Sequence, residues 1–232
     1  MRSTGGKLEE QPPLVGVERI AMRIDIWSDY VCPFCTIGER HLALALEQFE
    51  GRDDVEIVWR SFELDPDAPT EPRGTMVEQL AEKKRVSQEA AAENIEGLEG
   101  RAKNAGLNFN WRDAVLANTR DAHRVGKLAH EKGVGPAWDN TLKRGFFTEG
   151  KNIADHTLLR DIAAEVGLDR VEVDRVLASK EYDDAVQEDI DLAHRIGVQG
   201  VPFFVFDRRL AVSGAQPIPM FLQALKQAAA GQ

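Results

Sequence analysis

The sequence predicts an α/β fold in which one sheet-forming domain is interrupted by a large all-helical insertion. Strand patterns occur in two places, one near each end of the 232-residue chain. Residues 22–65 follow a β-α-β order and residues 197–232 a β-β-α order, whereas residues 66–196 show helical periodicity throughout. We therefore expect one discontinuous domain made of the two end segments, with the middle segment as a helical insertion domain.

The first half of the sheet domain is predicted from two short runs of apolar residues. Arg23–Trp27 is a strand, and the apolar residues of Pro33–Phe49 recur on one face of a helix. Val55–Leu64 alternates apolar with charged residues until Asp65-Pro66, where the proline disfavours further regular structure. Because parallel neighbouring strands need a crossover between them, this order predicts a parallel pair.

Helix caps and glycines divide the insertion into separate helices. Ser87 caps a helix that ends at Gly106, and two tryptophans, Trp111 and Trp138, are expected in the core. The acidic residues near the end of the insertion are expected to form a solvated face, Asp189 among them. The remaining helices are predicted over residues 119–132, 136–149, 155–166, 170–179 and 181–196.

Strand character returns after the insertion. Val201–Phe206 and Leu210–Ser213 are separated by Asp207-Arg208-Arg209, which predicts a hairpin, and Pro219–Ala230 follows as an amphipathic helix. If both ends of the chain share one sheet, the strand that starts at Val201 must lie beside the strand that ends at Trp27.

The segment Cys32-Pro33-Phe34-Cys35 holds the only two cysteines of the chain and follows the first predicted strand. Pro33 suits the first position of a helix, where its missing N–H removes no hydrogen bond. Cys32 then lies at the helix N-terminus, where unpaired amides and the helix dipole favour an anion. Cysteines in such positions have thiol pKa values lowered from about 8.5 to between roughly 3.5 and 7.5. The motif therefore predicts a nucleophilic, redox-active cysteine pair.

Two other interpretations of the cysteine pair are open, half a zinc site and two inert, packed thiols. A zinc site needs two further ligands at suitable spacing, but the chain has no second cysteine pair and its five histidines are scattered. Inert thiols are common in protein cores, but they do not explain a Cys-x-x-Cys spacing between a strand and a helix. We predict redox chemistry and no metal.

Composition and charge narrow the class of protein further. The net charge of −10 argues against a nucleic-acid-binding surface, and the apolar runs are too short to cross a membrane. Residues 1–21 lack the apolar stretch of a secretory signal and are expected to be a flexible N-terminal extension. We accordingly expect a cytoplasmic protein, with either Met1 or Met22 as the native start.

Several motifs together resemble the DsbA-like thioredoxin superfamily, and within it the cytoplasmic FrnE-type branch. The likeness spans about residues 22–228. It implies a thioredoxin-like fold with a large inserted all-helical domain. The stretches that carry the resemblance are Ser28–Cys35, Asn118–Arg124, Phe146–Gly150, Gly197–Phe206 and Ser213–Gln216.

The resemblance also implies a substrate groove beside the cysteine pair. Val201-Pro202 would form a loop with a cis-proline next to the active-site disulfide, where the Val201 backbone pairs with an extended substrate strand. The third motif position, a histidine in the periplasmic oxidants of the superfamily, is Phe34 here, which argues against a strongly oxidising role. Asp29 is a candidate proton relay. Asn118 is a candidate contact for a bound thiol ligand, with hydrogen bonding between domains as the alternative.

The expected function is that of a thiol–disulfide oxidoreductase or isomerase. Its partners would be disulfide- or thiol-containing proteins or small thiols, and it needs no cofactor beyond its own Cys32–Cys35 disulfide. Glutathione or another thiol is a candidate reductant. Two alternatives stay open, a glutathione-dependent isomerase or transferase of the same superfamily and a redox-switched holdase or interaction module. The sequence specifies neither the direction of electron flow nor the oligomeric state.

Overall fold

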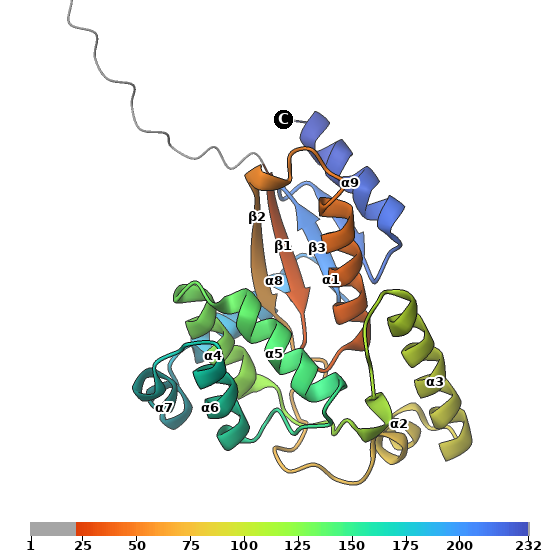
Figure 1. Ribbon diagram of the computed structural model, residues 1–232, viewed down its shortest axis with the longest axis vertical. Coiled ribbons are helices and arrows are strands. Elements are labelled where there is room, and N and C mark those ends of the chain that lie inside the picture. The colour runs from red at the N-terminus through yellow and green to blue at the C-terminus, as the bar shows by residue number, and fades with distance from the viewer. Residues whose placement is uncertain (1–21, 232) are drawn as a thin grey trace, which may run out of the picture.

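Alternating apolar residues at the two ends of the chain form one four-stranded mixed sheet with the strand order β2-β1-β3-β4 (Figure 1). β1 (Met22–Ser28) and β2 (Val55–Ser61) are parallel neighbours, as the β-α-β order predicts. β3 (Phe203–Phe206) is antiparallel to β1 on the other side, and β4 (Leu210–Ser213) completes the sheet as the antiparallel neighbour of β3. The mixed sheet confirms the predicted α/β fold with a helical insertion.

This computed structural model describes residues 22–231. The predicted flexible extension, residues 1–21, lies outside the described residues. Within the described part, no helix combines the length and the apolar character needed to cross a membrane. The cytoplasmic location stays a prediction.

The helices follow the predicted order, with one addition. α2, a nine-residue helix that sequence periodicity did not single out, begins at a capping box formed by Thr75 and Glu78. The bounds are α1 (Pro33–Leu46), α2 (Met76–Lys84), α3 (Gln88–Asn104), α4 (Arg120–Glu131), α5 (Gly135–Phe147), α6 (His156–Glu165), α7 (Arg170–Ala178), α8 (Asp183–Arg195) and α9 (Ile218–Ala230), with short 3-10 turns at Arg52–Asp54 and Trp111–Asp113.

The sheet is covered on both faces because side chains alternate along each strand. On β3, Phe204 and Phe206 pack with residues of α1 and α9 on one face. Phe203 and Val205 point the other way and pack with residues of α8. The last helix of the inserted segment therefore forms the third layer of the sheet domain.

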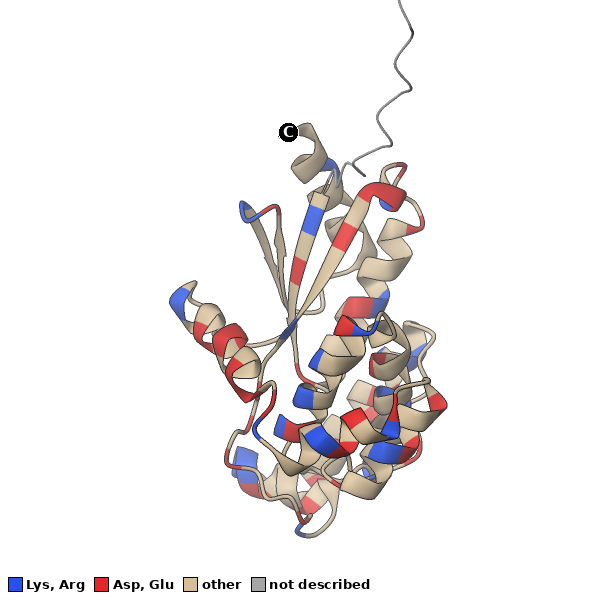
Figure 2. Ribbon diagram, turned by 90° about the vertical axis from the view of Figure 1, so that its left-hand side faces the viewer, with Lys and Arg blue, Asp and Glu red and all other residues tan. Residues whose placement is uncertain are grey.

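The rest of the insertion has a second hydrophobic core, to which α2 to α7 all contribute and which also includes Tyr30 and Val31 from the segment before Cys32. Trp111 is 5% exposed and Trp138 is completely buried, which confirms their predicted place in the core. Figure 2 shows that acidic and basic residues are interspersed along these helices.

Asp189 on α8 corrects the expectation of a uniformly solvated acidic face. Its side chain is only 3% exposed. The carboxylate accepts hydrogen bonds from Arg60 Nη1 at 2.8 Å and from the Ser61 amide at 2.9 Å, and it forms an ion pair with Lys127 of α4. In the same residue the backbone carbonyl accepts a hydrogen bond from Trp27 Nε1 at 2.9 Å. One residue thus joins the sheet, α8 and α4.

We expect Asp189→Ala to lower the free energy of unfolding by about 3 kcal/mol, because Lys127 and the Ser61 amide lose their acceptor in a largely buried setting. Urea unfolding followed by circular dichroism measures the change. The neighbouring exposed residue Glu188 provides the control, and Glu188→Ala should stay within about 0.5 kcal/mol of the parent protein. Equal stabilities for the two variants would contradict the role of Asp189.

Candidate active site

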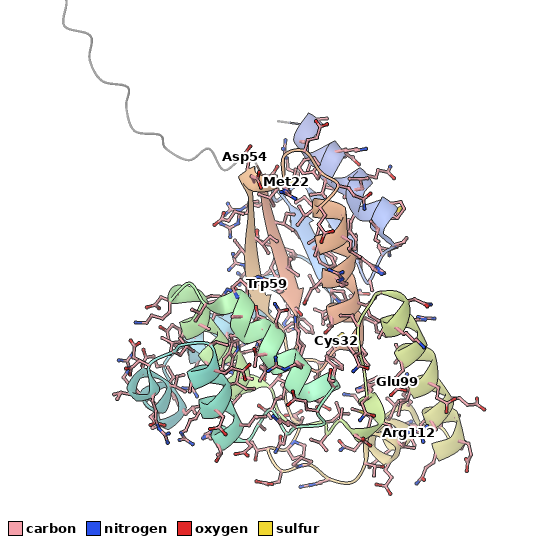
Figure 3. The ribbon with its side chains drawn as sticks, in the orientation of Figure 1. Met22, Cys32, Asp54, Trp59, Glu99 and Arg112 are labelled. Carbon is pink, nitrogen blue, oxygen red and sulfur yellow. The ribbon has the colours of Figure 1, made fainter. Side chains whose placement is uncertain are left out.

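The Cys-Pro-Phe-Cys segment forms the beginning of α1, directly after β1 (Figure 3). Cys32 is the N-cap residue with extended backbone angles, and Pro33 is the first helical residue, as the sequence predicts. The Cys35 amide, in the first turn of the helix, donates to the Cys32 carbonyl at 3.1 Å and also to Cys32 Sγ at 3.3 Å. The sulfur of Cys32 therefore occupies the position in which a helix N-terminus stabilises negative charge.

The Val201-Pro202 loop lies against this sulfur. The Val201–Pro202 peptide bond is cis, as the resemblance implies. The Cys32 thiol donates a hydrogen bond to the Val201 carbonyl oxygen, with 3.6 Å between sulfur and oxygen. α1 approaches the loop closely through Gly38, where an added Cβ would lie 3.0 Å from Pro202 Cγ. The absence of a side chain at Gly38 lets the helix and the loop pack directly together.

The three side chains of the motif differ in their access to solvent. Cys35 is completely buried, Cys32 is 3% exposed, and Phe34 is 38% exposed. Phe34 lines a cavity of about 300 Å³, whose other wall comes from α2 and α3 and includes Leu98. An exposed aromatic residue and an open cavity therefore lie directly beside the cysteine pair.

The two cysteines are free thiols in this structure. Burial raises the pKa of the Cys35 thiol well above its usual value, and the neighbouring Cys32 and the Glu39 carboxylate raise it further. Cys35 is therefore kept protonated until its proton has an acceptor. Cys32 Sγ caps the helix, whereas the Cys35 thiol retains its proton, so the two sulfurs differ in their chemistry.

Glu39 and Lys143 form a largely buried ion pair next to Cys35. Their side chains are 12% and 8% exposed. The Ser28 hydroxyl donates a hydrogen bond to Glu39 Oε1 at 2.6 Å, and Lys143 of α5 pairs with Oε2. Burial by itself lowers the pKa of the Lys143 ammonium, but Glu39 and Asp139 outweigh it, so that the pKa is raised. Lys143 therefore stays protonated, and through it the insertion places a positive charge beside the cysteine pair.

Sequence analysis missed both members of this ion pair. Glu39 follows Cys35 by one helical turn, so its side chain projects from the same face of α1, and this spacing is a usable signal. Lys143 is 104 residues from Glu39 along the chain and has no local signal.

Asp29, the candidate proton relay, is 1% exposed. Its Oδ2 accepts a hydrogen bond from the Leu64 amide at 2.8 Å, and its Oδ1 lies 3.4 Å from His123 Nε2. The backbone carbonyl of Asp29 accepts from the Cys32 amide at 3.1 Å. The residue thus positions the start of the motif through its backbone, and the relay role of its side chain stays a prediction.

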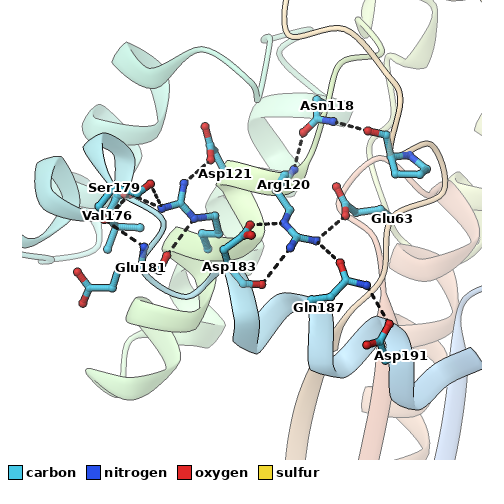
Figure 4. A network of polar contacts seen from close by, with 12 residues as sticks. Glu63, Asn118, Arg120, Asp121, Val176, Ser179, Glu181, Asp183, Gln187 and Asp191 are labelled. Atoms are coloured by element: carbon cyan, nitrogen blue, oxygen red, sulfur yellow. Dashed lines mark hydrogen bonds and ion pairs between the residues drawn. The ribbon is translucent and has the colours of Figure 1, made fainter. Parts of the chain in front are cut away.

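Asn118 lies in a polar network between the insertion and the segment that follows β2 (Figure 4). Its Nδ2 donates to the Pro66 carbonyl at 3.0 Å, and its Oδ1 accepts from the Arg120 amide at 2.9 Å. Arg120 in turn pairs with Glu63 and with Asp183 of α8. The side chain of Asn118 hydrogen-bonds within residues 66–196, and it is the ion pair of Arg120 with Glu63 that crosses to the sheet domain. A contact of Asn118 with a thiol ligand stays a prediction.

Among residues 22–231, no group of three or more His, Cys, Asp or Glu side chains is arranged to hold a metal ion.

The sheet order, the helix that begins at the dithiol and the cis-proline loop opposite it together define a thioredoxin-like fold with a helical insertion. The sequence model of the DSBA-like thioredoxin domain matches residues 23–226, and the chain belongs to that family. At the level of the family, it is placed among the thiol–disulfide oxidoreductases.

Comparison with individual proteins agrees with this placement. The chain is 40% identical to a probable DsbA oxidoreductase from Streptomyces coelicolor, whose crystal structure it matches with a TM-score of 0.87 over 91% of each chain. It is 27% identical to the uncharacterized protein YwbO of Bacillus subtilis, over 89% of this chain and 96% of the relative. The cytosolic disulfide reductase DsbM of Pseudomonas aeruginosa, solved with GSH, shares the fold at 19% identity, with a TM-score of 0.59 over 90% of this chain and 96% of DsbM.

Glu39→Gln should lower the pKa of the Cys35 thiol, because the substitution removes a neighbouring negative charge and leaves the positive charge of Lys143. The pKa is measured from the ultraviolet absorbance of the thiolate against pH in a Cys32→Ser background, where Cys35 is the only thiol. Glu47→Gln, at an exposed position where α1 ends, is the matched control and should leave the titration unchanged. An unchanged titration in Glu39→Gln would show that Glu39 has no influence on Cys35.

Proposed function

We propose that this protein exchanges disulfides with protein or small-thiol substrates, with Cys32 as the attacking and Cys35 as the resolving sulfur. The observation that carries the proposal is the position of Cys32 Sγ, which caps the N-terminus of α1 and faces the Val201 carbonyl. A sulfur in that position is stabilised as a thiolate and lies next to backbone that an extended substrate can pair with.

The reaction proceeds in two exchange steps. In the first, the Cys32 thiolate attacks a substrate disulfide, a bond forms between Cys32 and one substrate sulfur, and the other substrate sulfur leaves as a thiolate. In the second, Cys35 attacks Cys32 Sγ, and the remaining substrate sulfur leaves. Two electrons pass from the protein to the substrate, and a thiol reductant such as glutathione restores the dithiol. If another cysteine of the substrate, instead of Cys35, attacks the mixed disulfide in the second step, the substrate disulfide is isomerised and not reduced.

The second step needs an acceptor for the proton of the buried Cys35 thiol. Glu39 is suited to this role, because its carboxylate lies one helical turn from Cys35 and is held in place by Ser28 and Lys143. When Glu39 takes up the proton, its negative charge is neutralised and the Cys35 thiolate forms next to the positive charge of Lys143. The net charge among the three groups stays the same, which limits the cost of making a thiolate in a buried site.

The substrate side of the site is formed by Val201 and Phe34. The Val201 backbone offers pairing that does not depend on the substrate's sequence, and the exposed Phe34 ring offers apolar contact beside the cavity of α2 and α3. Because phenylalanine donates no hydrogen bond to the Cys32 thiolate, the reduced form receives no stabilisation from this position. We therefore assign the protein to the reducing or isomerising part of the range of reduction potentials that thiol–disulfide oxidoreductases cover.

Reduced protein should accelerate the reduction of insulin disulfides in the presence of a dithiol, as followed by turbidity. Cys32→Ser should abolish the acceleration, because the attacking sulfur is absent. Cys35→Ala should accumulate mixed disulfides, visible by mass spectrometry, because the resolving sulfur is absent. Full turnover by Cys32→Ser would refute the proposed function, and a titratable dithiol without turnover in the parent protein would favour the holdase alternative.

The reduction potential of the parent protein should be more negative than about −150 mV, away from the value of about −120 mV of a strong oxidant. Phe34→His should raise the potential, because a protonated imidazole stabilises the Cys32 thiolate of the reduced form. Phe34→Leu, which adds no donor, is the control. Equilibration with glutathione buffers measures all three proteins, and a parent value near −120 mV would overturn this interpretation of Phe34.

A further inference from the structure

The cavity of about 300 Å³ beside Phe34 lies where an extended substrate passes the cysteine pair. Its other walls come from Lys84, at the end of α2, and from residues 93–101 of α3. Figure 1 shows α3 beside the start of α1, where Ala102 packs with Ile37. Because Phe34 is two residues from Cys32, a substrate whose cysteine meets Cys32 brings its neighbouring residues to this cavity.

The walls next to the motif suit a large apolar side chain. Phe34 is 38% exposed although it is fully apolar, and Leu98 of α3 forms part of the facing wall. Between the charged ends of this part of α3 lies Gly97, where an added Cβ would meet no atom within 4 Å. The volume is at the lower end of the range for ligand cavities, which suits one side chain better than a cofactor.

Two cations at the cavity have no partner for their charge. Lys84 and Arg101 are exposed, and their side chains form no hydrogen bond or ion pair within residues 22–231. Glu93 is the one acidic residue among the described lining residues, and it precedes Arg101 by eight residues, about 12 Å along the helix. Arg101 adjoins Ala102, which packs against α1, so the end of the cavity nearest the cysteine pair is basic.

We propose that this cavity selects protein disulfides in which a large apolar side chain and an acidic side chain lie within two residues of the cysteine. The apolar side chain packs between Phe34 and Leu98, and the acidic one pairs with Lys84 or Arg101. The proposal rests on the proposed function, because the cavity acts on the substrate of the Cys32 exchange. Glutathione has carboxylates but no large apolar side chain, so it leaves the apolar part of the cavity unfilled.

Symmetric disulfides of short peptides test the proposal, and a palindromic sequence removes any dependence on the direction in which the peptide binds. Reduction of Glu-Phe-Cys-Phe-Glu, Lys-Phe-Cys-Phe-Lys and Glu-Ala-Cys-Ala-Glu is followed as kcat/KM, divided by the uncatalysed rate with dithiothreitol. The first peptide should exceed the third by at least about fivefold, as expected for partial burial of one phenylalanine ring. It should also be reduced faster than oxidised glutathione, and an equal or lower rate would contradict the apolar part of the proposal.

The same first peptide should exceed the lysine peptide by about threefold at low salt, the size expected for one exposed ion pair. The preference should disappear near 1 M salt, where the Debye length is about 3 Å. Long-range attraction to a chain of net charge −10 would favour the lysine peptide instead, so the sign of the preference reports on the cavity.

Two glycines of α3 provide a matched pair of variants for the apolar part. Gly97→Leu fills the cavity and should reduce the preference for phenylalanine over alanine to below about twofold. Gly100→Leu, at a glycine that is equally open but does not line the cavity, should retain the preference. Leucine favours a helix more than glycine does, so both variants are expected to fold.

Arg101→Glu should abolish or reverse the preference for the acidic peptide, whereas Lys103→Glu, at an exposed residue of the same helix turn outside the cavity, should retain it. Equal kcat/KM for the three peptides in the parent protein, or unchanged preferences in Gly97→Leu and Arg101→Glu, would overturn the proposal and leave the proposed function standing. Absence of catalysed reduction of every peptide would refute both.

Discussion

The antiparallel pairing of β1 with β3 is the constraint on which the rest of the site depends. It aligns Trp27, at the end of β1, with Phe203, at the start of β3. The chain leaves β1 towards Cys32 at the same end of the sheet at which it enters β3 from Val201. Two groups 169 residues apart in sequence are thereby placed in hydrogen-bond contact. A shift in the register of these strands would separate the sulfur from the carbonyl and move the side chains of β3 to the wrong faces.

The insertion takes part in this site and in the sheet domain. α8 covers one face of the sheet, and Asp189 ties that helix to β2 and to α4. α5 supplies Lys143, the partner of Glu39. Removing one member of a buried ion pair costs far more than leaving both in place, so movement of the insertion away from the sheet is resisted by charge as well as by packing. The positive charge beside the cysteine pair thus comes from the insertion, which contains neither cysteine.

Local patterns in the sequence predicted most of the fold. Strand alternation, helix caps and the Pro33 position depend on residues close together in sequence, and the structure has the corresponding elements in the predicted order. The cis bond at Val201-Pro202 came from a family resemblance, whereas the position of this loop follows from the two ends of the chain sharing one sheet. The burial of Asp189 and the ion pair of Glu39 with Lys143 depend on groups far apart in sequence. The residues adjacent to a charged side chain do not indicate which distant group will pair with it. α2 escaped prediction because it is only nine residues long.

The position of β3 near the end of the chain has a consequence for synthesis on the ribosome. β1, α1 and β2 emerge first and can pair, but the second edge of β1 stays open until residues 203–206 have followed. The whole insertion is made during that interval, so its own core can form while the sheet is still incomplete. A nascent chain at this stage already carries Cys32 at the start of its helix but lacks the Val201 carbonyl that faces it. The vulnerable period for oxidation of that thiol is therefore set by the time needed to translate the insertion.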